Sequence, residues 1–176
     1  MTKISRAALL GAGSAIALVG LPLMTSFVEA AQSADRGDVG MLNAAIELER
    51  AGIKAYVDAA GTGLISPGIL KIAQGFIADH TAHRDALIAA VVAGGGQPSQ
   101  GTVKLAYPAL KTEADIIRFA LVVEEKAAST YLSVIPDFKD RALAGVAASI
   151  LGVETTHVAT LSGALGQPAY KSGFVG

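Results

Sequence analysis

Four long stretches of the sequence space their apolar residues at the three-to-four-residue period of an α-helix. They cover residues 38–60, 67–93, 112–135 and 138–165. In each stretch, glutamate or histidine interrupts the apolar stripe near its middle. An amphipathic helix must bury its stripe against another element, so this pattern predicts an all-α fold built as a four-helix bundle.

Residues with strong helix-end preferences mark the boundaries. Ser66 and Pro67 predict the start of the second helix, with the serine as its N-cap. Thr112 with Asp115 predicts a capped start for the third, and Pro136 predicts its end. The links between the first and second helices and between the third and fourth are short. Each of these pairs is therefore expected to form an antiparallel hairpin.

The link between the two hairpins, residues 94–111, is much longer and shows no helical period. About eighteen extended residues span roughly 60 Å, whereas a 27-residue helix is only about 40 Å long. The third helix can therefore begin at the end of the bundle opposite to where the second one finishes. The expected architecture is two antiparallel helical hairpins joined by a long crossover.

The N-terminus has the pattern of an export signal. Lys3 and Arg6 precede an uncharged apolar stretch over residues 7–24, and small residues favour cleavage after Ala30. A retained membrane anchor is the alternative. Cleavage predicts a periplasmic or secreted protein with no membrane partner. The expected division is a signal peptide (1–30), a linker (31–37), the bundle (38–168) and a C-terminal tail (169–176).

Composition excludes several kinds of site. The chain has no cysteine, which excludes disulfides and thiolate metal ligands. Its formal net charge is −1, so no strongly basic surface for nucleic acid is expected.

The two halves of the sequence repeat each other. Two residue pairs are related by an offset of 75 and two by an offset of 74: Glu49 with Glu124, Tyr56 with Tyr131, His80 with Glu154, and His83 with His157. The repeat indicates a duplicated helical hairpin, with its two copies related by a rough two-fold axis. Polar core residues are therefore expected in matched pairs.

The polar residues of the four stripes are expected to meet at the centre of the bundle. They are Glu49, His80, His83, Glu124, Glu154 and His157. An i, i+3 spacing sets two side chains on one helix face, and three uncompensated buried carboxylates would cost several kcal/mol each. We therefore predict that they bind metal ions. A buried network of protonated histidines and glutamates is the alternative. Tyr56 and Tyr131 are expected to pack in the core with a hydrogen bond, where they could contact the ligands; redox participation is the alternative.

Other residues of the helices are expected to face solvent or to serve helix packing. Charged neighbours of the stripe are expected to face solvent: Glu47, Asp79, Arg84, Asp85, Glu125 and Lys126. A shift of one residue in the third helix would exchange Glu125 with Glu124. Close approach of neighbouring helices is the expected reason for the helix glycines 52, 75, 145, 152 and 163.

Four segments carry a family resemblance: "LNAAIELERAGIKAY", "ADHTAHRDAL", "VVEEKAASTY" and "LGVETTHVATL". Through them the chain resembles the ferritin-like superfamily, in particular exported bacterial ferritin-like domain proteins, a branch that includes desiccation-related proteins. The resemblance implies that Glu49 and Glu124 are terminal ligands of a dinuclear metal centre. It also implies that His83 and His157 are its imidazole ligands and that Glu154 is a bridging carboxylate.

His80 departs from this family pattern, because it stands where di-iron members carry a second bridging glutamate. The resemblance implies iron or manganese, and the extra imidazole leaves zinc or copper open. If the protein is an enzyme, the resemblance implies an oxidoreductase acting on dioxygen, peroxide or ferrous iron. The alternative is a non-catalytic stress-protection or structural module. Iron storage would require a homo-oligomeric cage.

Overall fold

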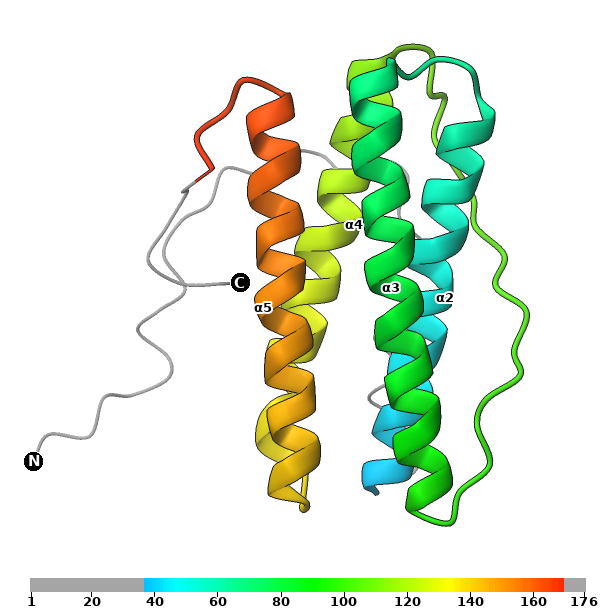
Figure 1. Ribbon diagram of the computed structural model, residues 1–176, viewed down its shortest axis with the longest axis vertical. Helices are drawn as coiled ribbons and strands as arrows, with labels where there is room; N and C mark the ends of the chain where they lie inside the picture. The colour runs from blue at the N-terminus through cyan, green and yellow to red at the C-terminus, as the bar shows by residue number, and fades with distance from the viewer. Residues whose placement is uncertain (1–36, 170–176) are drawn as a thin grey trace, which may run out of the picture.

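The computed structural model describes residues 37–169, which form four long helices (Figure 1). They are α2 (Asp38–Gly61), α3 (Pro67–Ala93), α4 (Glu113–Val134) and α5 (Arg141–Ala164), with a short 3₁₀ turn, η2 (Ile135–Asp137), before α5. Residues 37–169 contain no strand. The predicted all-α four-helix bundle is confirmed. The predicted signal peptide, most of the linker and all but the first residue of the tail lie outside the described residues.

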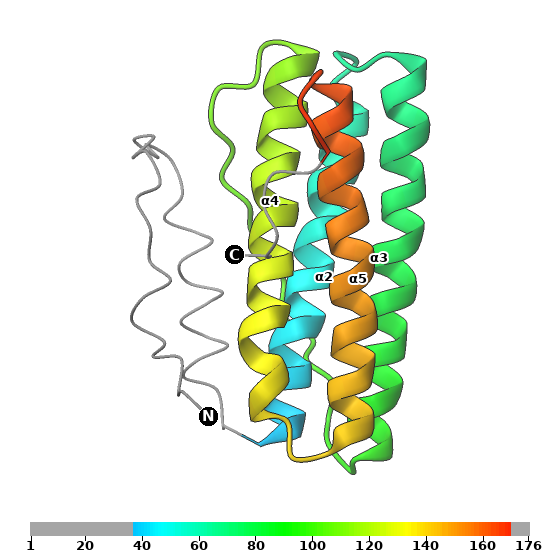
Figure 2. The same cartoon turned by 90° about the vertical axis from the view of Figure 1, so that its left-hand side faces the viewer.

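The four helices pack as two hairpins. α2 lies mainly against α3, and α4 lies mainly against α5. The hairpins meet where α2 contacts α4 and where α3 contacts α5, as Figures 1 and 2 show from two sides. The crossover between α3 and α4 runs from one end of the bundle to the other (Figure 1). The predicted long crossover is therefore confirmed.

Polar side chains of α2 hold the crossover in place. The Ser99 N–H donates to Oδ1 of Asn43 at 2.7 Å, and the Ser99 hydroxyl donates to Glu47 at 2.5 Å. Further along, the Tyr107 hydroxyl donates to Asp58 at 2.5 Å. The Glu47 side chain is only 20% exposed and faces the crossover, so the prediction that it faces solvent is wrong.

The predicted helix starts agree with the structure except at α5. α3 begins at Pro67 with Ser66 as its N-cap, although the Ser66 side chain makes no capping hydrogen bond; instead, the Ser66 N–H donates to the Glu113 carboxylate at the start of α4. The predicted capping box of Thr112 and Asp115 is present at the start of α4. The fourth helix begins at Arg141, three residues later than expected, because the Asp140 carboxylate accepts the Ala142 N–H at 2.7 Å and caps it there.

The apolar core is divided into two clusters. The first cluster contains Met41, Leu42, Ile46, Leu48, Leu87, Val91, Ala127, Tyr131, Phe138, Ala147 and Ile150. The second contains Tyr56, Ala73, Phe76, Ile117, Ala120, Leu121 and Leu161. Along every helix, the predicted metal ligands fall between the residues of the two clusters. A polar layer therefore crosses the middle of the bundle.

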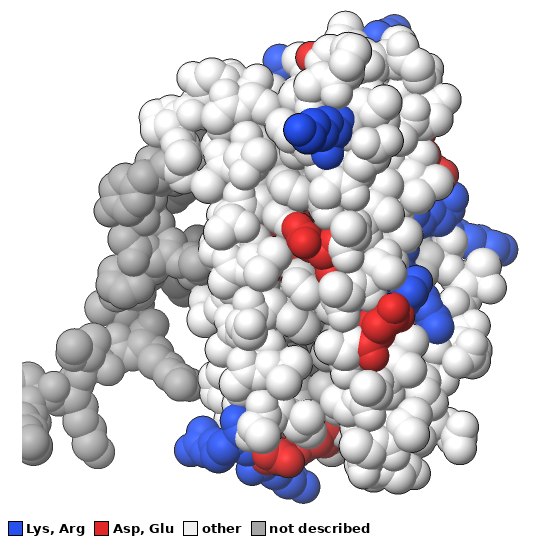
Figure 3. All heavy atoms as spheres, in the orientation of Figure 1, with Lys and Arg blue, Asp and Glu red and all other residues white. Residues whose placement is uncertain are grey.

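The face over α3 and α5 is mostly uncharged (Figure 3). Among the described helices, α5 alone is long and apolar enough to cross a membrane by length and composition. This helix also supplies Glu154 and His157 to the interior of the bundle, where both are buried. Only 22% of its most apolar window is buried, so α5 also presents apolar residues outward.

Candidate metal centre

The structure brings all six predicted ligands together, in the polar layer between the two apolar clusters. Each of α2 and α4 contributes one glutamate, and each of α3 and α5 contributes an i, i+3 pair. Five of the six residues are at most 2% exposed, and the His83 side chain is 12% exposed. Among the described residues, the other buried polar residue is Ser162. The bundle therefore concentrates its buried charge at one place.

A first group of donor atoms comes from Glu49, His80, His83 and Glu154, and these atoms lie within 4.8 Å of one another. His83 Nδ1 is 3.4 Å from Glu49 Oε2 and 3.2 Å from Glu154 Oε1. His80 Nδ1 is 2.8 Å from the same Glu49 oxygen. Two imidazoles and two carboxylates thus surround one position.

A second group of ligand atoms comes from His80, Glu124, Glu154 and His157, and these atoms also lie within 4.8 Å of one another. His157 Nδ1 lies 3.4 Å from Glu124 Oε2 and 3.5 Å from Glu154 Oε2. Glu154 therefore turns Oε1 to the first group and Oε2 to the second, as a bridging carboxylate does. His80 also belongs to both groups, since its Nε2 lies 3.3 Å from Glu124 Oε1.

Five buried side-chain atoms at this centre that could bind a metal ion have no hydrogen-bond partner. They are Nδ1 of His83, Nδ1 of His157, Oε2 of Glu124 and both carboxylate oxygens of Glu154. Leaving such groups unsatisfied costs about 1 to 3 kcal/mol each, and more for charged groups. They face one another across the centre as ligands around a cation do, and carboxylate oxygen with imidazole nitrogen suits divalent transition metals. The donor set therefore fits a dinuclear metal centre.

Two buried tyrosines hold the glutamates of the opposite hairpin. The Tyr56 hydroxyl donates to Glu124, and the Tyr131 hydroxyl donates to Glu49. Each tyrosine thus spans from one copy of the repeat to the other. Hydrogen bonds of this kind orient a ligating carboxylate, which agrees with the expectation that the tyrosines contact the ligands.

The backbone of α2 makes room for His80. A Cβ atom added at Gly52 would lie 3.0 Å from both Cε1 and Nε2 of the His80 ring. The other helix glycines singled out in the sequence, at 75, 145, 152 and 163, have open space at this position. Close approach therefore explains Gly52 but not those four, for which the expectation is wrong.

Asp79 contacts the centre, which the sequence analysis did not predict. Its Oδ2 lies 3.1 Å from His157 Nε2, although the Asp79 side chain is 52% exposed. A carboxylate on the outer ring nitrogen fixes the tautomer and directs Nδ1 inward. The equivalent position in the other copy is Val153, so the repeat offered no signal for this contact.

The buried carboxylates raise the pKa of each of the three histidines. Burial lowers the pKa of His80, but hydrogen bonds to Glu124 and Glu49 outweigh this effect and raise it to about 11. The carboxylates that face His83 and His157 likewise outweigh the effect of burial and raise the pKa of each histidine to about 9. Burial raises the pKa of Glu154. A bound metal would displace protons from these groups and replace them as the source of positive charge.

The family model for the ferritin-like domain matches residues 37–167. The chain belongs to the ferritin-like domain family. Its fold is ferritin-like, and its His/Glu cluster lies in the middle of the bundle. No curated protein matches the sequence.

Two solved structures resemble this ferritin-like domain. One is a conserved hypothetical protein, rv2844, from Mycobacterium tuberculosis, with a TM-score of 0.66 and 20% identity over 86% of this chain and 99% of that one. The other is described as ferritin-like, diiron-carboxylate proteins from Bacillus anthracis, with a TM-score of 0.61 and 16% identity over 81% of this chain and 96% of that one. At these identities the likeness shows the fold alone.

Replacement of Gly52 tests whether the His80 ring needs the space beside α2. Gly52→Ala is expected to lower the free energy of unfolding by about 1 to 3 kcal/mol, since the new methyl group meets the ring. Gly152→Ala is the matched control on α5 and is expected to stabilise by up to about 1 kcal/mol. Urea unfolding of the chelated proteins measures both. Equal stabilisation by the two substitutions would contradict the packing described.

Proposed function

We propose that this ferritin-like protein is exported and binds two divalent transition-metal ions in the middle of its bundle. The proposed ligands are Glu49, His80, His83, Glu124, Glu154 and His157. The observation that carries the proposal is the convergence of buried carboxylate oxygens and imidazole nitrogens that lack hydrogen-bond partners. Protonated histidines could pair with the facing carboxylates only at long range, at 3.2 to 3.5 Å, whereas metal ions would engage oxygens and nitrogens together.

Each residue has a distinct role in this proposal. Glu49 with His83 would bind the first ion, and Glu124 with His157 would bind the second. Glu154 would link the two ions, and His80, which belongs to both groups of ligand atoms, would complete either site. Iron or manganese is proposed first, in view of the diiron-carboxylate structural neighbour. The extra imidazole of His80 favours zinc or copper as the alternative. When bound, iron or manganese would supply one-electron chemistry toward dioxygen or peroxide.

The residues around the centre would control which molecules reach the metal ions. The two apolar clusters close the centre from both ends of the bundle and limit the entry of water. Tyr56 and Tyr131 keep the carboxylates of Glu124 and Glu49 in place. His83 is the most exposed of the six ligands, so a small oxidant would reach the centre on its side. An oxidoreductase is therefore the proposed enzyme class.

A non-catalytic module for stress protection is the second candidate. Its support is the near-complete burial of five ligands, which come from all four helices. Metal bound to such a set would stabilise the bundle by joining both hairpins, since binding free energy adds to folding free energy. In this case the metal has a structural role and no substrate is turned over.

Adjacent carboxylates on α4 provide a matched test of metal binding. Glu124 is fully buried, whereas Glu125 is exposed. Glu124→Gln removes a charged ligand and is expected to weaken metal binding by at least about tenfold, as losses near metal centres do. Glu125→Gln should leave the metal content unchanged. Chelated protein is titrated anaerobically with Fe²⁺ and with Mn²⁺, and bound metal is measured by mass spectrometry.

The two variants also test the register of α4. Metal loss in Glu125→Gln with full content in Glu124→Gln would overturn the assignment of Glu124. Full metal content in Glu124→Gln and also in the double variant Glu154→Ala, His157→Ala would overturn the metal centre itself. Far-ultraviolet circular dichroism of each chelated variant establishes that the helices are present.

Turnover separates the enzyme from the structural module. An oxidoreductase loaded with iron or manganese should consume peroxide, or oxidise added ferrous iron, in excess of its own bound metal. Absence of turnover with iron, manganese, zinc and copper would leave only the structural module, provided that metal raises the melting temperature. Light scattering of the loaded protein detects the closed cage of subunits that iron storage requires.

Export is the part of the proposal that concerns the N-terminus. Its support is the sequence pattern of residues 1–30. Cleavage after Ala30 gives a mature protein that begins at Ala31, as intact mass and N-terminal sequencing of protein from the culture medium and periplasm would reveal. Protein that retains Met1 in the membrane fraction would instead establish the anchor.

A further inference from the structure

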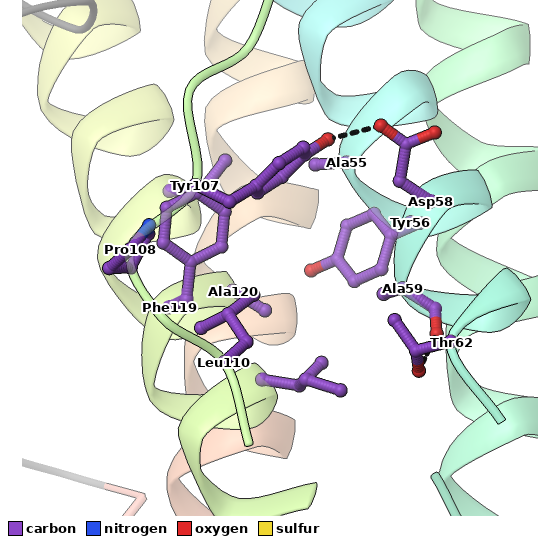
Figure 4. A pocket seen from close by; sticks show the side chains of 12 residues that line it. Ala55, Tyr56, Asp58, Ala59, Thr62, Tyr107, Pro108, Leu110, Phe119 and Ala120 are labelled. Carbon is purple, nitrogen blue, oxygen red and sulfur yellow. Dashed lines mark hydrogen bonds between the residues drawn. The ribbon is translucent and has the colours of Figure 1, made fainter. Parts of the chain in front are cut away.

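A pocket of about 250 Å³ lies between α2, α4 and the crossover (Figure 4). Alanines at facing positions leave this space open: Ala55 and Ala59 on α2, and Ala120 on α4. The crossover passes over the pocket at Tyr107, Pro108 and Leu110. The pocket therefore exists because small side chains line both helices beneath a covering segment.

The walls of the pocket are mainly apolar and aromatic. The Tyr107 and Phe119 rings meet at 5.5 Å between centroids with an interplanar angle of 64°. Tyr56 lines the pocket on the α2 side, and Figure 4 shows its ring directed into the space between α2 and α4. Aromatic rings bind other rings favourably in edge-to-face and offset arrangements. The walls thus suit a flat aromatic molecule.

Polar groups occur at one side of the pocket. Oδ2 of Asp58 accepts a hydrogen bond from the Tyr107 hydroxyl at 2.5 Å (Figure 4) and one from the Lys54 ammonium at 2.7 Å. These hydrogen bonds lower the pKa of Asp58, so its carboxylate remains an acceptor at neutral pH. The Thr62 hydroxyl lies on the same wall. Both hydrogen bonds use Oδ2, so a bound molecule with one hydrogen-bond donor would use Oδ1 as its acceptor.

We propose that this pocket binds a small single-ring aromatic molecule that carries one hydroxyl group, with its ring between Tyr107, Phe119 and Tyr56 and its hydroxyl at Asp58. The volume supports one ring: a cavity of about 150 Å³ accepts benzene, and this pocket has room for a ring with a short substituent. Pockets that bind drug-sized ligands have volumes of about 300 Å³ or more.

The pocket adjoins the candidate metal centre without sharing its ligands. Tyr56 lies between the two: its ring lines the pocket, and its hydroxyl donates to Glu124. The same ring stacks near His80, with centroids 5.7 Å apart. The bound aromatic molecule would thus contact a side chain that holds a proposed metal ligand, while its own binding requires no metal.

Binding is tested with p-cresol as the probe and toluene as the molecule that lacks the hydroxyl. Isothermal titration of the full chain, chelated and metal-loaded, is expected to give saturable binding of p-cresol in both forms. Toluene should bind about tenfold more weakly, because it cannot donate to Asp58. Saturable binding in the chelated form keeps this proposal separate from the outcome of the metal experiments.

Variants that fill the pocket locate the binding. Ala59→Leu and Ala120→Leu each place a larger side chain in the space and are expected to weaken p-cresol binding by at least about tenfold. Ala148→Leu, on an exposed position of α5, is the matched control and should bind as the natural chain does. Asp58→Asn should reduce the advantage of p-cresol over toluene.

Three results would overturn the proposal. They are absence of saturable p-cresol binding to the natural chain, unchanged binding in a folded Ala59→Leu or Ala120→Leu variant, and equal binding of toluene and p-cresol. Melting temperatures show which variants are folded. Having two filling variants, one on each helix, preserves the test if one of them fails to fold.

Discussion

Three carboxylates lie in the middle of an otherwise apolar four-helix bundle, and the rest of the structure depends on how their charge is balanced. Glu124 and Glu154 are fully buried and Glu49 is 1% exposed. Removing a carboxylate from water without compensation costs several kcal/mol, a large share of the net stability of a domain. Histidines, tyrosine hydroxyls and the metal ions that we propose all compensate this buried negative charge. The division of the core into two apolar clusters follows from the same layer.

Much of this architecture could be predicted because helical period and duplication are both local patterns. The apolar stripe marks the inward face, so a glutamate or histidine on the stripe must point inward as well. Matching residues in two copies then identifies which polar positions belong together. All six predicted residues meet in the structure for this reason, and the tyrosines accompany them.

The misses concern contacts that the helical period does not encode. Glu47 lies off the stripe of α2, yet the crossover passes over it and the Ser99 hydroxyl donates to it. Asp79 likewise lies off the stripe of α3 but reaches His157 on α5. The later start of α5 depends on which acidic residue caps the helix, and both Asp137 and Asp140 stand before it in the sequence. These details depend on how segments distant in the sequence pack together, and the apolar pattern of a single helix does not predict that packing.

The crossed hydrogen bonds of Tyr56 and Tyr131 have a consequence for how the two hairpins relate. In an isologous dimer, a residue of one subunit contacts a different residue of its partner, and the reverse contact occurs at the symmetric position. The two hairpins of this chain satisfy that rule within a single polypeptide, with Tyr56 on Glu124 and Tyr131 on Glu49. Neither hairpin contains a complete set of ligands, and each tyrosine holds the glutamate of the other hairpin. The unit that can assemble this centre is therefore a pair of hairpins, and the crossover makes that pairing independent of protein concentration.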